Sequence, residues 1–151
     1  MVITCSDTRT PDTDTSGQLI HKLLRQFGHE VISYHLVKDE PAQIKGRIAE
    51  GLVNEAVQAI IINGGTGISK RDSTFEAIDG MLEKKLVGFG EIFRYLTYQD
   101  IGSPAIMSRA TAGIIKGRVL FSTPGSENAV RLAMEKLILP ELGHLVKELT
   151  K

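Results

Sequence analysis

The sequence predicts an α/β fold in which a mostly parallel β-sheet carries one antiparallel hairpin. In the first half of the chain, short apolar runs alternate with longer segments of helical spacing, a pattern that builds right-handed βαβ units. In the second half, two apolar runs flank Lys116-Gly117, which is a two-residue hairpin signal. The length of 151 residues is typical of one domain, so residues 1–151 are expected to form a single domain.

Three strands of the parallel part are expected at residues 2–5, 31–37 and 59–62, where the short apolar runs lie. The run 2–5 looks like the second half of a longer strand, as though a preceding segment were missing. Such a loss would weaken an edge of the sheet without changing the fold.

Amphipathic helices are expected between these strands. The first has Asp14 or Ser16 available as N-cap and Gly28 as its stop, and the second suits Pro41 at its first position. The residues expected to face the core are Leu19, Ile20, Leu23, Leu24 and Phe27 in the first helix and Ile44, Ile48, Leu52 and Val53 in the second.

The second half of the chain predicts the hairpin and further helices. The hairpin strands are expected at 112–115 and 119–121, and the strand that ends at Phe121 is taken as antiparallel to the others. The helices, marked by apolar residues at helical spacing, are expected from Ser73 or Thr74 to Leu82, over 88–100, through 129–137, and from Pro140 onward.

Composition excludes several classes of function. The 18 Lys and Arg balance the 18 Asp and Glu, so no overall field attracts nucleic acid or an acidic membrane surface. There is no apolar stretch long enough to span a bilayer and no signal-peptide pattern, and the lone Cys5 is expected to be buried. We therefore expect a cytoplasmic protein. The histidines lack metal-ligand spacing, and no nucleophile elbow is present.

Ligands of open parallel α/β sheets bind beyond the carboxyl ends of the strands, where loops and helix N-termini converge. The loops expected at this edge are 6–9, 38–40, 63–73 and 122–128. These loops therefore contain the candidate functional residues.

The turn Asn63-Gly64-Gly65-Thr66-Gly67 is expected to bind a phosphate. Gly64, Gly65 and Gly67 let the backbone approach an anion, and Thr66 adds a hydroxyl donor. An ordinary strand-to-helix turn is the alternative interpretation. The spacing fits neither a P-loop nor a dinucleotide-binding fingerprint.

Asp39 and Asp72 are candidate metal ligands. Two carboxylates beside a phosphate site would repel the ligand unless a hard cation such as Mg²⁺ lay between them. The alternatives are that Asp39 is a solvated loop acid, and that Asp72 or Ser73 caps the next helix.

Two further segments suit an anionic ligand. Ser108-Arg109 combines a hydroxyl with a guanidinium group that fits a phosphate or carboxylate, although a surface ion pair is equally plausible for Arg109. Pro124-Gly125-Ser126 precedes a helix and offers a second group of amides, although Ser126 could serve as an N-cap alone.

Taken together, the motifs resemble the MoaB/MogA family of molybdenum cofactor biosynthesis proteins over nearly the whole chain, with the opening segments favouring the MoaB branch. The motifs that carry this resemblance are Ser6-Asp7-Thr8-Arg9, Asp14-x-Ser16-Gly17, Asn63-Gly64-Gly65-Thr66-Gly67, Arg71-Asp72-x-Thr74-x-Glu76-Ala77, Gly88-Phe89-Gly90-Glu91, Ser108-Arg109 and Pro124-Gly125-Ser126.

The resemblance implies a three-layer α/β/α fold that assembles as a homo-oligomer, either a trimer or a hexamer. It also implies Mg²⁺-dependent adenylylation of molybdopterin by ATP, giving adenylyl-molybdopterin and pyrophosphate. Other proteins of molybdenum cofactor biosynthesis are the implied partners.

Site roles follow from the same resemblance. Asp39 and Asp72 would hold the metal and orient the reacting phosphates. The nucleotide phosphates would bind at Gly64, Gly65, Thr66 and Gly67 with Ser6 and Asp7, and molybdopterin at Ser108, Arg109, Pro124, Gly125 and Ser126.

Two other functions remain open at the level of sequence. One is a non-catalytic molybdopterin-binding or carrier protein, and the other is a CinA-like nucleotide pyrophosphatase domain, which the Gly-Gly-Thr-Gly and Arg-Asp-x-Thr segments disfavour. Phe75 departs from the family, which usually has proline there, and this change alters only the first helical turn.

Overall fold

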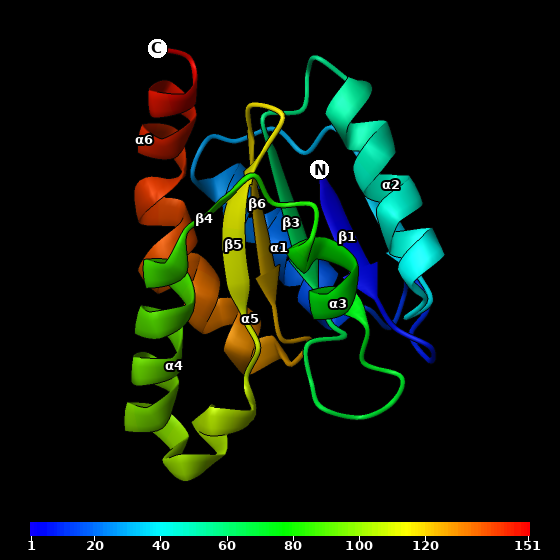
Figure 1. Ribbon diagram of the computed structural model, residues 1–151, viewed down its shortest axis with the longest axis vertical. Coiled ribbons are helices and arrows are strands. Elements are labelled where there is room, and N and C mark those ends of the chain that lie inside the picture. Colours follow the sequence, from blue (N-terminus) through cyan, green and yellow to red (C-terminus); the bar gives the residue numbers. More distant parts are fainter.

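A six-stranded sheet with the strand order β2-β1-β3-β6-β5-β4 forms the centre of the molecule, which is described over residues 1–151 by a computed structural model (Figure 1). β1, β2, β3 and β6 are parallel to one another, and β5 is antiparallel to both of its neighbours. The strands are β1 (Val2–Cys5), β2 (Tyr34–Val37), β3 (Ala59–Asn63), β4 (Lys84–Lys85), β5 (Thr111–Ile115) and β6 (Arg118–Thr123).

Helices cover both faces of this sheet, as Figure 1 shows for α2 and α3 on one side and α1, α4, α5 and α6 on the other. The helices are α1 (Thr15–Gln26), α2 (Pro41–Val53), α3 (Thr74–Asp79), α4 (Val87–Ile101), the 3₁₀ segment η1 (Ser103–Met107), α5 (Glu127–Ala133), the π-helical segment η2 (Met134–Ile138) and α6 (Leu139–Leu149).

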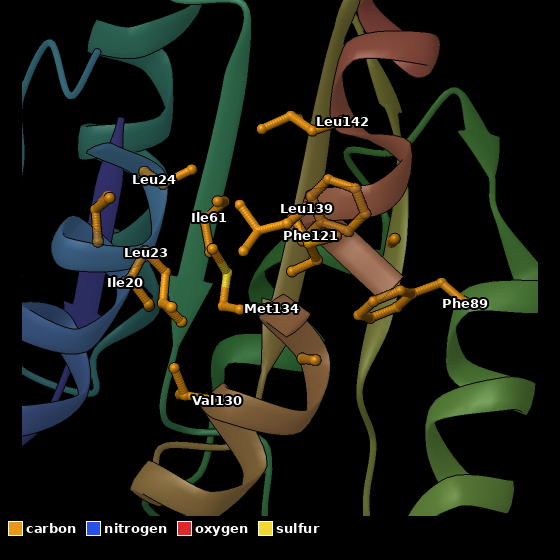
Figure 2. Packing of buried hydrophobic residues seen from close by; sticks show 14 of the residues in the cluster. Ile20, Leu23, Leu24, Ile61, Phe89, Phe121, Val130, Met134, Leu139 and Leu142 are labelled. Carbon is orange, nitrogen blue, oxygen red and sulfur yellow. The ribbon is translucent and has the colours of Figure 1, made fainter. Parts of the chain in front are cut away.

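Side chains alternate along the strands and so form two apolar cores. Val2 and Ile61 belong to the core on the α1 side of the sheet, whereas their neighbours Ile3 and Ile62 belong to the core on the α2 side. Figure 2 shows the α1-side core, in which Ile61 of β3 and Met134 of η2 take part. The three-layer α/β/α fold and the mostly parallel sheet are therefore confirmed.

The local signals for the first helix and the hairpin are confirmed. The Asp14 side chain caps α1 by accepting a hydrogen bond from the Gly17 amide, and Gly28 after the helix has a positive φ of 82°. Lys116 and Gly117 have positive φ values of 45° and 73°, as a two-residue hairpin turn requires.

Two residues expected in the core and two expected boundaries differ from the structure. Phe27 is 59% exposed, because it is the C-cap residue that follows the last turn of α1. Val53 is 81% exposed, because it lies beyond the stripe that Ile44, Ile48 and Leu52 turn toward the sheet. β2 begins at Tyr34 rather than at residue 31, since it pairs only with the four residues of β1. α3 ends at Asp79 rather than at Leu82, and the short edge strand β4 that follows was not predicted.

The direction of one hairpin strand also differs from the prediction. β6, which contains Phe121, runs parallel to β3, so that β5 is the antiparallel strand. The end of β6 and the start of β5 consequently lie at the carboxyl edge of β1, β2 and β3. This arrangement brings residues 108–111 and 123–126 to the edge where a ligand site is expected.

The C-terminal region is helical from Glu127 to Leu149 without a break in the helical backbone. The two predicted helices are joined by η2, which ends two residues before Pro140. Proline has no backbone N–H, so Pro140 cannot donate the hydrogen bond of a regular α-helix at this place. All helices of the structure are too short or too polar to cross a membrane.

Candidate functional site

A cavity of about 470 Å³ opens at the carboxyl edge of the parallel strands. The loops after β1, β2, β3 and β6 line it together with α4 and η1. It gathers most of the predicted site residues, namely Ser6, Asp39, Gly64, Gly65, Thr66, Gly67, Asp72, Ser108, Pro124, Gly125 and Ser126. Another cavity, of about 250 Å³ at the opposite edge, is lined mainly by apolar residues.

The glycine-rich turn packs directly against the neighbouring loops. Gly64 and Gly65 have positive φ values of 96° and 69°, and a Cβ on Gly64 would lie 2.2 Å from the carbonyl oxygen of Cys5. A Cβ on Gly125 would lie 3.1 Å from the Cα of Gly64. Glycine is therefore required both by the backbone conformation and by the closeness of three loops.

Asp39 lies beside this turn and is 8% exposed. Its Oδ1 accepts hydrogen bonds from the amide of Ser73 at 3.1 Å and from the Ser73 hydroxyl at 2.7 Å. A Cβ on Gly65 would lie 2.8 Å from Oδ2 of Asp39, and that oxygen makes no hydrogen bond within the protein. One carboxylate oxygen thus faces the glycine-rich turn, and Asp39 is not the solvated loop acid of the alternative interpretation.

Asp72 lies at the other end of the same loop. Its Oδ2 accepts hydrogen bonds from the amide of Ser69 at 2.9 Å and from the Ser69 hydroxyl at 2.6 Å. A Cβ on Gly67 would lie 2.7 Å from this carboxylate. Ser73 occupies the N-cap position of α3 without a side-chain capping bond, so the capping interpretation of Asp72 or Ser73 is wrong.

Asp7 does not line the cavity but supports it from outside. Its carboxylate forms two hydrogen bonds of 2.9 Å with the guanidinium group of Arg71 and accepts one from the amide of Asp39 at 3.1 Å. The bonds from Arg71 and from the Asp39 amide lower the pKa of Asp7 to about 2. Asp7 therefore connects the loop after β2 to the loop after β3.

Arg109 also lies outside the 470 Å³ cavity. Its guanidinium group donates hydrogen bonds to the carbonyl oxygens of Thr66, at 3.2 Å, and of Gly67, and it pairs with Glu76. The ring of Phe75 lies 5.3 Å from the guanidinium carbon. Arg109 therefore binds the carbonyl oxygens of the glycine-rich turn from outside the 470 Å³ cavity. It lines a separate cavity of about 330 Å³.

Sequence reasoning missed two parts of the cavity. Arg9 lines it, although the site prediction took only Ser6 and Asp7 from that loop. The other part is a mostly apolar wall from α4 and η1, made of Phe93, Thr97, Ile101, Pro104 and Met107. The signal for Arg9 was its place in a loop at the carboxyl edge, whereas no local pattern marks η1 as a cavity wall.

Asp39 and Asp72 are the two carboxylates that line the 470 Å³ cavity. No group of three or more His, Cys, Asp or Glu side chains is arranged so that it could hold a metal ion by itself. Any cation bound between Asp39 and Asp72 would take its remaining ligands from a substrate or from water.

Comparison with known proteins agrees with this fold. Residues 1–144 match the family model described as "Probable molybdopterin binding domain". The chain belongs to the MoaB/MogA family of molybdenum cofactor biosynthesis proteins. The resemblance of the motifs to this family, and to its MoaB branch, is thereby confirmed.

Two relatives illustrate the similarity within the family. Molybdenum cofactor biosynthesis protein B of Bacillus cereus is 55% identical over 149 residues, which cover 98% of this chain and 88% of the relative. A crystal structure of a molybdenum cofactor biosynthesis protein B is 55% identical, with a TM-score of 0.96 and coverage of 99% of this chain and 93% of that one. A CinA protein from Thermoplasma acidophilum, at 17% identity and a TM-score of 0.63, shares the fold alone.

Proposed function

We propose that this chain, acting as a single domain over residues 1–151, adenylylates molybdopterin. The terminal phosphate of molybdopterin attacks the α-phosphate of ATP, the bond from the α-phosphate to the β-phosphate oxygen breaks, and pyrophosphate leaves. The observation that carries this proposal is that Asp39 and Asp72 line the same cavity as the glycine-rich turn. An acid pair beside a phosphate site suits metal-assisted phosphoryl chemistry better than simple binding.

The residues present fit a magnesium ion. Asp39 and Asp72 each keep one carboxylate oxygen free of hydrogen bonds within the protein, and Ser73 and Ser69 fix the other oxygen. Mg²⁺ bound by these two acids would neutralise charge on the phosphates, and it typically completes its coordination with substrate phosphates and water.

The chain's own groups would bind and orient the two substrates. Backbone amides of Gly65, Thr66 and Gly67 and the Thr66 hydroxyl would receive nucleotide phosphates, with Ser6 at the same cavity, whereas the Gly64 amide already donates to the Thr123 carbonyl oxygen. Ser108, which follows η1, and the loop 124–126, which precedes α5, would receive molybdopterin. The Ser126 hydroxyl oxygen caps α5 by accepting a bond from the Ala129 amide at 3.2 Å, which leaves the Ser126 amide and the hydroxyl proton as donors for a ligand.

Asp7 and Arg109 act indirectly in this proposal. Asp7 would position Asp39 through the Asp39 amide, and Arg109 would shape the glycine-rich turn through the carbonyl oxygens of Thr66 and Gly67. A structural group that fixes a phosphate-binding turn contributes to catalysis by preorganisation.

The test measures adenylyl-molybdopterin formed from molybdopterin and ATP with Mg²⁺. Wild type should turn over, whereas Asp39→Ala and Asp72→Ala should lose at least about a hundredfold in rate, as expected for loss of a metal ligand. Asp79→Ala is the matched control, because Asp79 of α3 pairs with Lys85 of β4 and does not line the 470 Å³ cavity. Molybdopterin binding without turnover would favour the carrier function, and no molybdopterin binding would contradict both.

A homo-oligomer, either a trimer or a hexamer, belongs to the same proposal. Its support is a set of large apolar side chains left exposed on α4 and on η1, two elements that pack against each other, since a concentration of exposed apolar side chains is typical of an interface between proteins. These residues are Val87, Ile92, Tyr95, Tyr98, Ile101, Ile106 and Met107. Light scattering should give a multiple of the monomer mass for wild type and a smaller species for Ile92→Glu, and a monomeric wild type would contradict the assembly.

A further inference from the structure

Arg9 is the one lysine or arginine among the residues that line the 470 Å³ cavity. Two carboxylates, Asp39 and Asp72, line the same cavity. The other arginines of the neighbouring loops are engaged outside it, Arg71 with Asp7 and Arg109 with Glu76. A cavity that receives phosphates therefore has a single side-chain cation of its own.

The side chain of Arg9 is held in place by two partners and keeps donors to spare. One Nη donates to Asp14 at 3.3 Å, and the other donates to the carbonyl oxygen of Gly125 at 3.0 Å. A guanidinium group carries five N–H donors, so three remain without a partner in the protein. These remaining donors are available to a ligand.

Asp14, the carboxylate partner of this arginine, is itself held in place by other hydrogen bonds. It is fully buried, caps α1 through the Gly17 amide at 3.0 Å, and accepts a hydrogen bond from the Tyr34 hydroxyl. Burial by itself would raise the pKa of Asp14, but the bonds from Tyr34, Thr4 and Gly17 outweigh it and lower the pKa. Asp14 is consequently ionised at neutral pH and fixes the orientation of Arg9.

Arg9 and Asp39 are anchored by residues that belong to opposite faces of the sheet. Asp14, which anchors Arg9, begins α1 and therefore lies on the α1 side of the sheet. Asp39 is bonded to Ser73 at the start of α3, which packs on the α2 side. A phosphate chain that rests on the turn would meet carboxylates, and any metal they hold, at one end and the guanidinium group at the other.

We infer that Arg9 is a phosphate-binding residue of this cavity, and that Asp14 is the residue that positions it. This inference rests on the proposed function for the identity of the ligand. The phosphate comes either from ATP or from the terminal phosphate of molybdopterin, and both would be recognised by the same charge-assisted hydrogen bonds.

A purely structural role for Arg9 makes a different prediction, and Ser16 allows the two to be separated. The Ser16 hydroxyl donates to the same carbonyl oxygen of Gly125 at 2.7 Å, so Ser16→Ala weakens the support of the loop 124–126 without removing a charge. If Arg9 only held this loop, Arg9→Ala and Ser16→Ala would have similar effects on ligand binding.

The experiment measures dissociation constants of ATP with Mg²⁺, of molybdopterin and of pyrophosphate with Mg²⁺ by calorimetry, at low and high salt. Arg9→Ala should weaken binding of ATP or of molybdopterin by roughly 10- to 100-fold, the usual effect of losing charge-assisted hydrogen bonds. The ligand that is affected identifies the source of the phosphate. Arg9→Lys should recover part of the loss, Ser16→Ala should lose less than about threefold, and the exposed Arg131→Ala should match wild type.

Salt provides a readout that a structural role would not change. Higher ionic strength should weaken binding of the affected ligand more for wild type and Ser16→Ala than for Arg9→Ala, because the latter has lost the charge that salt screens. Equal salt dependence in all variants, or unchanged affinities in Arg9→Ala, would overturn the role of Arg9.

The inference and the proposed function can fail separately. If wild type binds phosphate ligands but forms no adenylyl-molybdopterin, the transferase proposal fails while the Arg9 comparison still gives a result. If wild type binds neither ATP nor molybdopterin, pyrophosphate is the probe, and absence of pyrophosphate binding by wild type would overturn the inference as well.

Discussion

Asp39 and Ser73 are 34 residues apart in sequence, yet Oδ1 of Asp39 accepts both the amide and the hydroxyl hydrogen bond of Ser73. Because Ser73 directly follows Asp72, this contact fixes the distance between the loop after β2 and the loop that carries the second acid. The geometry of the acid pair thus depends on hydroxyl groups next to it rather than on the acids alone.

Ser73→Ala should loosen Asp39 while leaving the fold intact. The variant removes a hydroxyl bond to a carboxylate but keeps the amide bond, so we expect a loss of about 1–2 kcal/mol in unfolding free energy. Turnover should fall more steeply than ATP affinity, since positioning of the acid is what is lost. Urea unfolding and steady-state kinetics measure the two effects, and unchanged kinetics would show that Ser73 does not position Asp39.

Asp72→Asn should separate the charge of Asp72 from its structural contacts. An asparagine oxygen can still accept the bonds from the Ser69 amide and hydroxyl, so unfolding free energy should change by less than about 1 kcal/mol. Mg²⁺-dependent adenylylation should nevertheless be abolished. A large loss of stability with activity retained per folded molecule would mean that Asp72 is structural.

Gly65→Ala should be strongly destabilising. The new Cβ would lie 2.2 Å from Oγ1 of Thr74 and 2.8 Å from Oδ2 of Asp39, at a φ of 69°. Left-handed backbone strain and overpacking together predict a loss of about 2–5 kcal/mol. Gly46→Ala is the control, because nothing lies within 4 Å of its Cβ and it lies within α2, so it should stabilise by about 0.5–1 kcal/mol. Thermal unfolding of both variants compares them directly.

Cys5 should resist alkylation in the folded protein. Burial raises the pKa of the Cys5 thiol to about 12, and the residue is 5% exposed although it borders the cavity. At pH 8 its thiolate fraction should be roughly a thousandfold below that of an unfolded cysteine, which slows reaction with iodoacetamide accordingly. The comparison is labelling with and without denaturing urea, and equal rates would contradict the buried, protonated thiol.

Tyr34→Phe should make the protein more sensitive to acid. The pKa of Asp14 is lower in the folded than in the unfolded chain, so the carboxylate stabilises the fold above its unfolded pKa of about 3.9, and this stability is lost as pH falls through the folded pKa. Removing the Tyr34 hydroxyl raises that folded pKa, so the acid midpoint followed by circular dichroism should move to higher pH. The exposed Tyr98→Phe is the control and should leave the midpoint unchanged.

Local patterns account for the parts of the fold that were predicted correctly. The apolar runs and helical spacing located β1, β3, α1 and α2, and Lys116-Gly117 marked the hairpin turn, because these features depend on neighbouring residues. The glycine-rich turn was likewise visible, since its positive φ values at Gly64 and Gly65 demand glycine. Together with the order of the motifs, these signals sufficed for the fold class and the family.

Contacts between distant residues decided the rest. Arg109 faces Glu76 and the back of the turn, and Arg9 reaches Gly125, which is 116 residues away in sequence. Sequence alone places an arginine in a loop, but its long side chain can turn to either side of that loop. Which side it takes depends on the carboxylates and carbonyl oxygens that the packed sheet presents there, and that choice is made only when the loops after β1, β3 and β6 come together.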